Sequence, residues 1–114
     1  MNAEHSDRYQ IFYTDSAVND IEAKADYIFR KFRDPHLAEV WYLRLRDEIQ
    51  GDLSFLPCKY QLYDVEPWNQ KGIRLFLTRN DVVLYSVGDS AHAVYIRAVC
   101  ARGRDLSAHL AENQ

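Results

Sequence analysis

Cysteine, glycine and proline are all scarce in this chain of 114 residues, which has two cysteines, four glycines and three prolines. Cys58 and Cys100 lack the spacing of metal ligands, and each lies in or beside an apolar run, so we expect two buried free thiols rather than a disulfide. Free thiols are typical of a reducing compartment. Four glycines form no glycine-rich phosphate loop, and there is no Gly-x-Ser-x-Gly sequence. The sequence therefore contains no motif for nucleotide-dependent or acyl-transfer chemistry.

Two further absences concern membranes and charge. No apolar run approaches the roughly 18 residues that a membrane span needs, and residues 1–8 contain no apolar signal-peptide core. The net charge is −3, whereas a protein that binds nucleic acid over its whole surface needs many cations to neutralise phosphates. We therefore expect a soluble cytoplasmic protein, with one domain over residues 1–114 and frayed ends at 1–8 and 111–114.

The charge is segregated along the chain despite this acidic balance. Residues 1–50 contain ten acidic and seven basic residues, which gives −3. Residues 71–104 contain six basic and two acidic residues, which gives +4. This pattern predicts a protein with one basic site and an acidic back.

The first half of the chain has the pattern of a strand followed by a helix. Residues 9–13 alternate as a half-buried strand does, and Thr14, Asp15 and Ser16 are candidate N-caps for the helix behind them. The apolar positions of this helix lie three or four residues apart and predict one buried face, formed by Val18, Ile21, Ala25, Ile28 and Phe32.

A second helix follows almost at once. Asp34 can cap its free amides, and Pro35 at the first helical position gives up an N–H that has no partner there. Its apolar positions recur every four residues before Pro57 stops it, and they are Leu37, Trp41, Leu45, Ile49 and Leu53. Two helices joined so tightly predict an antiparallel helical hairpin.

The second half of the chain reads as a small sheet. Residues 57–72 form a surface loop that carries Trp68. Three runs rich in Val, Ile, Leu and Tyr follow at 73–78, 82–87 and 94–101, and the short polar breaks between them predict an antiparallel meander. Asp105 can cap a short helix over 105–114. The predicted fold class is α+β, in the order β-α-α-β-β-β, with the helical hairpin packed on one face of an antiparallel sheet.

These elements and their motifs resemble the RelE/ParE family of bacterial type II toxin–antitoxin systems, from residue 9 to about residue 110. The resemblance is most specific in five segments, which are, in chain order, Glu66-Pro67-Trp68, Gly72-Ile73-Arg74, Asn80-Asp81-Val82-Val83-Leu84-Tyr85, Val94-Tyr95-Ile96-Arg97-Ala98-Val99 and Arg102-Gly103-Arg104-Asp105. Each segment alone is a weak signal, and their order carries the inference.

The resemblance implies a growth inhibitor of a plasmid-stabilisation module, neutralised by a cognate antitoxin that wraps around it. RelE-like toxins cleave messenger RNA on the ribosome without a metal, whereas ParE-like toxins bind and poison DNA gyrase. A shared fold does not choose between these functions. A third interpretation is a non-toxic binding module of the same fold, which the negative net charge favours.

The candidate site residues of the resemblance are mostly arginines. Arg74 matches a basic position at the entrance of the family's sheet, and Arg102 and Arg104 match its basic exit, while Arg97 joins them if it shares their face. Metal-free RNA cleavage needs a base, an acid and cations for the charge that builds on phosphorus, and arginine supplies only the cations. The alternative is that these four are surface arginines paired with nearby acids.

Three other residues complete the list of candidates. Tyr95 alternates with Arg97 and is a candidate to stack on a base. Trp68 either meets a partner or, in the interpretation we prefer, covers an edge of the core. His109 lies where nucleolytic members often have a tyrosine or histidine, so it is either a general acid or base or, as we prefer, an exposed histidine on a frayed tail. The other histidines are isolated from one another, so we expect no metal and no cofactor.

The sequence as a whole slightly favours the ParE-like mechanism. A lysine-rich surface and a clear acid–base pair are both missing, which weakens the nuclease interpretation. An antitoxin segment with an apolar helix and acidic side chains is the expected partner, because it suits both the amphipathic hairpin and the arginines.

Overall fold

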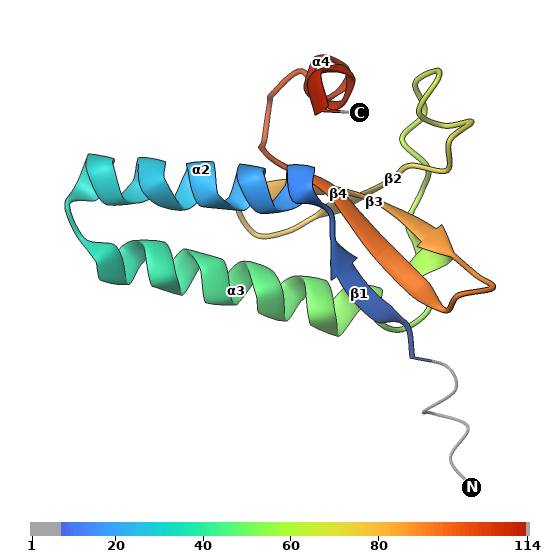
Figure 1. Ribbon diagram of the computed structural model, residues 1–114, viewed down its shortest axis with the longest axis horizontal. Coiled ribbons are helices and arrows are strands. Elements are labelled where there is room, and N and C mark those ends of the chain that lie inside the picture. Colours follow the sequence, from blue (N-terminus) through green and yellow to red (C-terminus); the bar gives the residue numbers. More distant parts are fainter. Residues whose placement is uncertain (1–7, 114) are drawn as a thin grey trace, which may run out of the picture.

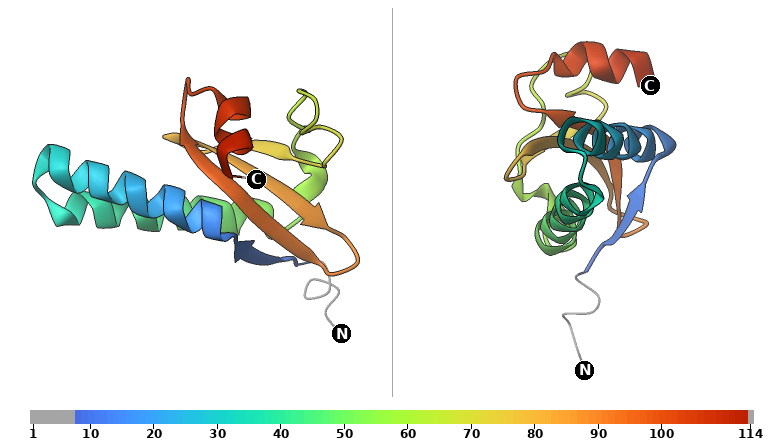
Figure 2. Two further views of the ribbon diagram at one scale, coloured as in Figure 1. Left: turned by 45° about the horizontal axis from the view of Figure 1, so that its top comes forward. Right: turned by 90° about the vertical axis from the view of Figure 1, so that its left-hand side faces the viewer.

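The computed structural model describes residues 8–113, in which one sheet lies between a long helical hairpin and a short C-terminal helix (Figures 1 and 2). The elements are, in chain order, β1 (Gln10–Tyr13), α2 (Asp15–Phe32), α3 (Pro35–Leu53), the 3-10 turn η1 (Pro57–Lys59), β2 (Arg74–Leu77), β3 (Asp81–Gly88), β4 (Ala93–Ala101) and α4 (Leu106–Asn113). The predicted α+β fold class and element order are confirmed.

The helices begin at capping residues that were predicted from the sequence. The Thr14 hydroxyl accepts a hydrogen bond from the Ala17 N–H at 3.2 Å, and the Asp34 carboxylate accepts one from the His36 N–H at 2.9 Å. Asp105 caps α4 in the same way, through the Ala108 N–H at 3.1 Å. Each cap satisfies an amide that has no partner within its helix. Local sequence therefore sets the start of all three helices.

The sheet has the strand order β1-β4-β3-β2. Strands β2, β3 and β4 form the predicted antiparallel meander. The prediction of a purely antiparallel sheet is wrong for β1, which pairs with β4 in parallel, with Ile11 opposite Val94. Parallel neighbours require a long crossover connection. Here the helical hairpin and the two other strands form it.

A β-bulge interrupts the pairing of β3 and β4. Leu84 pairs with Ala98 and Tyr85 with Ile96, so Arg97 is an extra residue without an opposite partner on β3. The bulge reverses the side of the sheet to which the following residues point, so that two residues two positions apart lie on opposite faces. Ile96 packs on the hairpin side of the sheet, whereas Ala98 packs on the α4 side.

Each face of the sheet has its own core. The core on the hairpin side contains Ala17, Ile21, Trp41, Leu45, Ile49, Leu53, Phe76, Val83, Tyr85, Val94, Ile96 and Val99. The core on the α4 side contains Trp68, Ile73, Val82, Leu84, Ala98, Cys100 and Leu110. Figure 2 shows the sheet between these two layers.

Three residues of the predicted helical stripes are exposed instead of buried. Phe32 and Leu37 lie at the tip of the hairpin, which projects beyond the sheet and so has nothing to pack against (Figure 1). Val18 is exposed on a flank of α2. The rest of the second stripe, from Trp41 to Leu53, is buried as predicted.

The chain ends and the cysteines also differ in part from expectation. Arg8, predicted to fray, forms an isolated bridge with Phe55, and α4 continues through Asn113. The remaining residues of the predicted frayed ends, 1–7 and 114, lie outside the described residues. Both cysteines are free, but Cys58 is exposed and only Cys100 is buried. Within residues 8–113, no helix has the length and apolar character to cross a membrane.

Candidate functional site

Arg74 lies on the hairpin side of the sheet, on the same face of β2 as Phe76. Its guanidinium donates to the carbonyl oxygens of Tyr60 at 2.6 Å and Cys58 at 3.3 Å. The Tyr85 hydroxyl donates to the Pro57 carbonyl at 2.6 Å beside it. Burial raises the pKa of Tyr85 well above its usual value, and the nearby Arg74 guanidinium opposes this. Arg74 therefore holds the η1 segment against the sheet.

Arg97 lies on the opposite face, where it forms a small surface with its neighbours. Its Nε donates to the Ser86 hydroxyl at 3.0 Å, and its guanidinium lies 5.6 Å from the ring centre of Tyr95. Tyr95 in turn stacks on Phe12, with ring centres 5.8 Å apart. We call Phe12, Ser86, Tyr95 and Arg97 the sheet patch. It brings together two of the predicted partner-binding residues, Tyr95 and Arg97.

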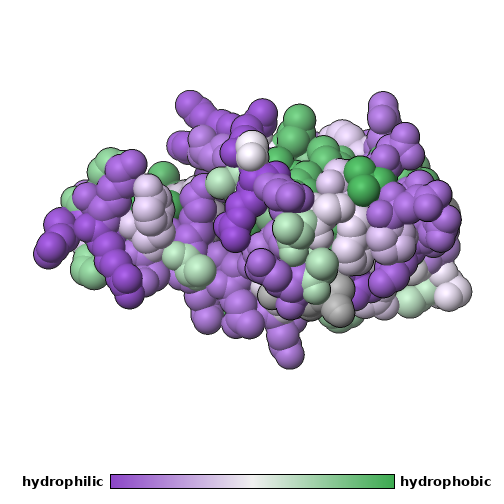
Figure 3. All heavy atoms as spheres, turned by 90° about the horizontal axis from the view of Figure 1, so that it is seen from above, coloured by the Kyte–Doolittle hydropathy of each residue, from purple (hydrophilic) through white to green (hydrophobic). Residues whose placement is uncertain are grey.

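The sheet patch is the part of the α4-side face that α4 leaves open. Phe12 is 43% exposed, and Tyr95 and Arg97 are half-buried. Figure 3 views the molecule from the α4 side and shows hydrophobic and hydrophilic side chains mixed on this face, with the most hydrophobic ones toward one edge. A flat aromatic surface with a cation beside it suits a partner that offers a planar or an acidic group.

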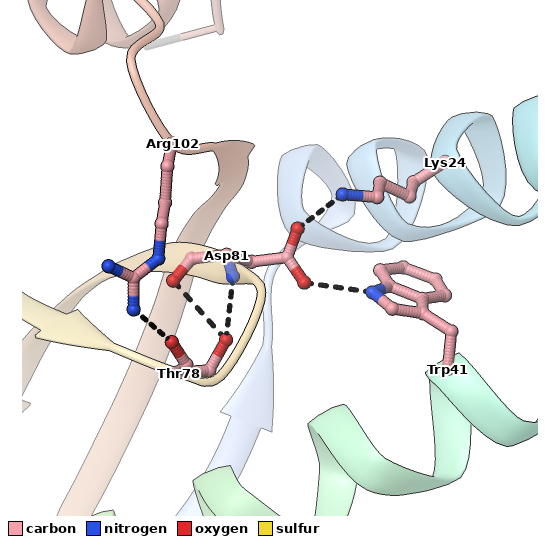
Figure 4. A network of polar contacts seen from close by, with 5 residues as sticks. All are labelled: Lys24, Trp41, Thr78, Asp81 and Arg102. Carbon is pink, nitrogen blue, oxygen red and sulfur yellow. Dashed lines mark hydrogen bonds and ion pairs between the residues drawn. The ribbon is translucent and has the colours of Figure 1, made fainter.

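Arg102 and Arg104 lie away from both of these positions. The Arg102 guanidinium donates to the Thr78 carbonyl, at the turn between β2 and β3 (Figure 4). Arg104 is exposed and lines a hollow between α2 and α4. The four predicted arginines are therefore distributed over two faces and one end of the sheet, and they do not gather around one anion.

His109 is buried, which contradicts the prediction of an exposed histidine on a frayed tail. It is 8% exposed, and its Nε2 lies 2.9 and 3.0 Å from the two carboxylate oxygens of Asp20 on α2. Asp20 also accepts the Val99 N–H of β4 at 2.9 Å. His109 therefore ties α4 to α2. The sequence offered no signal for this contact, because the two residues lie 89 positions apart.

Trp68 covers an edge of the core, as the preferred interpretation predicted. It is buried among the α4-side residues, and its Nε1 donates to the Ser107 hydroxyl at 3.0 Å. Lys71 lies over the outer side of the ring, 5.0 Å from its centre. The tryptophan thus fastens the 57–72 loop to α4.

A buried carboxylate that was not among the predicted site residues joins the hairpin to the sheet. Asp81 is 1% exposed, and its carboxylate accepts from Lys24 Nζ at 2.6 Å and from Trp41 Nε1 at 2.8 Å (Figure 4). Its backbone N–H donates to the Thr78 hydroxyl at 2.9 Å. One side chain therefore satisfies polar groups from α2 and α3 at the start of β3.

An apolar hollow lies between α2 and α3 where β1 ends. Its walls include Tyr13, Val18, Ala25 and Tyr42. Arg46 lies at the adjoining surface, with its guanidinium 5.7 Å from the Tyr42 ring centre. Burial raises the pKa of Tyr13, and the Arg46 guanidinium opposes the shift. We call these five residues the hairpin groove, a largely apolar surface with Glu22 also in its wall and the Arg46 cation at its end.

Comparison with known proteins identifies the fold. No protein-family model matches the sequence, and no curated protein matches it. A chain of the toxin–antitoxin complex RelBE2 from Mycobacterium tuberculosis is 19% identical with a TM-score of 0.60, and the match covers 85% of this chain and 94% of that chain. A chain of the chromosomal ParDE toxin–antitoxin system from P. aeruginosa is 16% identical with a TM-score of 0.64, and covers 82% of this chain and 96% of that one.

The protein therefore has the RelE/ParE toxin fold, as its motifs predicted. One of these structures comes from a RelBE2 complex and the other from a ParDE system, so the likeness does not favour one mechanism. At these sequence identities the likeness concerns the fold, and the function has to be argued from the site.

Proposed function

We propose that this chain is the toxin of a type II toxin–antitoxin module that stabilises a plasmid or a chromosomal region. It acts in the cytoplasm, and it inhibits growth by binding its target, as a ParE-like inhibitor of DNA gyrase does. The arrangement of the candidate site residues carries this proposal. Arg74, Arg97 and Arg102 donate to carbonyl or hydroxyl groups of the protein itself, whereas Arg104 lines the hollow that Asp20 and His109 also line, so the four arginines do not gather around one anion.

The position of His109 supports binding rather than catalysis. A general acid or base must reach the proton that it transfers, directly or through one water. The Nε2 atom of His109 instead faces the Asp20 carboxylate within the protein, and both side chains are about nine-tenths buried. A binding mechanism needs only a complementary surface, which the sheet patch supplies.

The antitoxin is the second part of the proposal. The hairpin groove offers an apolar surface for one face of an amphipathic helix, and Arg46 at its end offers a cation for an acidic side chain. The exposed arginines Arg102 and Arg104 extend the positive charge toward the other end of the sheet. An antitoxin segment with apolar positions at helical spacing and acidic flanks fits this distribution.

A RelE-like ribosome-dependent nuclease is the second candidate, and one observation favours it. Tyr95 and Phe12 stack on each other beside Arg97, and exposed rings next to a guanidinium are a common means of holding unstacked RNA bases. In that case the sheet patch binds the messenger RNA and catalysis uses groups that come together only on the ribosome.

Induction of the chain alone and together with the adjacent reading frame tests the proposal. We expect growth arrest with the toxin alone and rescue by its neighbour, with loss of DNA supercoiling activity and intact messenger RNA in the arrested cells. The absence of both arrest and a co-purifying small partner would leave only the non-toxic binding module.

One variant separates the mechanisms, and a second tests the sheet patch under both. His109→Gln keeps a hydrogen-bond donor for Asp20 but removes the imidazole that a general acid or base would need, so a gyrase inhibitor stays toxic whereas a nuclease that uses His109 stops cleaving RNA. Arg97→Ala weakens toxicity under either mechanism. Arg30→Ala is the matched control, because Arg30 is exposed on α2 and pairs only with Asp26 in the described residues.

A further inference from the structure

Three side chains that bind metals in other proteins come together beneath α4. Asp20 comes from α2, Cys100 from β4 and His109 from α4, and one potential ligand atom of each lies within 4.8 Å of the others. Cys100 and His109 are buried, and the side chain of Asp20 is about nine-tenths buried as well. A carboxylate, a thiol and an imidazole are the three ligand types that zinc sites use.

Only small side-chain movements are needed for a metal ion to fit between these three ligand atoms. Zinc–nitrogen and zinc–oxygen bonds of about 2.0–2.2 Å at a tetrahedral angle place the two ligand atoms about 3.4 Å apart. His109 Nε2 and Asp20 Oδ2 are 2.9 Å apart, so they need to separate by about half an ångström. The Cys100 sulfur lies within 4.8 Å of the other two ligand atoms and so has to approach by at most about 1 Å or slightly more, within what a side-chain rotation provides.

The charges also fit a divalent ion. One carboxylate, one thiolate and a neutral imidazole carry a combined charge of about −2, which neutralises a dication. The N–H of Val99 already donates to Asp20 Oδ2, so the carboxylate is held in place by the strand that carries Cys100. Such outer-sphere hydrogen bonds are usual around protein metal sites.

We propose that Asp20, Cys100 and His109 bind one Zn²⁺ ion, which clamps α4 to α2 and β4. The fourth position opens toward a hollow of about 510 Å³, where a water molecule completes the tetrahedron. Lys24 and Arg104 line the same hollow, and their positive charges favour a water or an anion over a second cation. This inference is independent of the toxin function.

Cobalt is the probe that tests the site. The protein is first stripped with a chelator, desalted and kept reduced, and Co²⁺ is then titrated into it. A thiolate-to-cobalt charge-transfer absorption in the near ultraviolet should saturate at one equivalent, and Zn²⁺ should displace it. Zn²⁺ should also raise the melting temperature of the wild-type protein. Folded wild-type protein without the absorption band overturns the proposal.

The two cysteines provide a matched pair of variants. Cys100→Ala should abolish the charge-transfer band and weaken Zn²⁺ binding more than about tenfold, since even outer-sphere losses cost that much. Cys58→Ala removes the exposed thiol and should leave the band unchanged. Loss of the band in Cys58→Ala instead would place the metal elsewhere and refute the site. This control and the wild-type titration decide the question even if Cys100→Ala does not fold.

Discussion

The hairpin side of the sheet buries a larger core than the α4 side. Among residues 8–113, twelve buried residues form the first core and seven form the second. The hairpin covers its face with two helices of 18 and 19 residues, whereas α4 has eight residues and leaves the sheet patch open. We conclude that the hairpin side supplies most of the stability. The α4 side has the exposed surface that a binding protein needs.

A matched pair of leucines tests this difference in stability. Leu45 on the hairpin side and Leu110 on α4 are 2% and 0% exposed. We expect Leu45→Ala to lower the free energy of unfolding by about 4 kcal/mol and Leu110→Ala by about 3 kcal/mol, because a short helix relaxes more easily into the space left behind. Urea denaturation measures both. A larger loss of stability for Leu110→Ala would show that the α4-side core contributes more to stability than the hairpin-side core.

Removal of the Asp81 carboxylate, which joins the hairpin to the sheet, should cause the next largest loss of stability. Asp81→Ala leaves the buried N–H of Trp41 without its acceptor and removes the ion-pair partner of Lys24, so we expect a loss of about 3 kcal/mol. Asp26→Ala is the control, since its ion pair with Arg30 is exposed and should contribute less than about 0.5 kcal/mol. Equal losses in denaturation experiments would show that the hairpin is not fastened through Asp81.

A smaller effect should appear at alkaline pH. Burial raises the pKa of Tyr85 above that of an unfolded tyrosine, so above pH 10 the folded state retains a proton that the unfolded state releases. Stability is then full below pH 10 and falls by about 1 kcal/mol per pH unit above it. Tyr85→Phe should flatten this slope relative to the wild-type protein. If the fall of stability with pH is unchanged in Tyr85→Phe, other titrating groups cause it.

The sheet patch should matter least for stability and most for function. Phe12→Ala should change the free energy of unfolding by less than about 1 kcal/mol, because Phe12 is already 43% exposed. It should nevertheless weaken growth inhibition several-fold, as loss of an aromatic interface residue does. Leu77→Ala is a suitable control, since Leu77 is also an exposed apolar residue but lies on β2, away from the patch. Equal toxicity of the two variants would exclude the patch as the target-binding surface.

Much of the fold was predictable because its signals are local. Thr14, Asp34 and Asp105 cap their helices with hydrogen bonds that span two or three residues. The four-residue spacing from Trp41 to Leu53 defines the buried side of α3 wherever the sheet lies. The site was less predictable, because its contacts join distant segments. Neither the bulge at Arg97 nor the pairing of His109 with Asp20 has a local pattern.

The sequence by itself determined the helices, the three-strand meander and the class of fold, because capping, periodicity and turn residues act over a few positions. Only the tertiary structure decided that β1 lies parallel to β4, that the predicted arginines are dispersed, and that Asp20, Cys100 and His109 meet. The physical reason is the same in each case. These outcomes depend on strand register and on how α4 packs across the sheet, which no short stretch of sequence specifies.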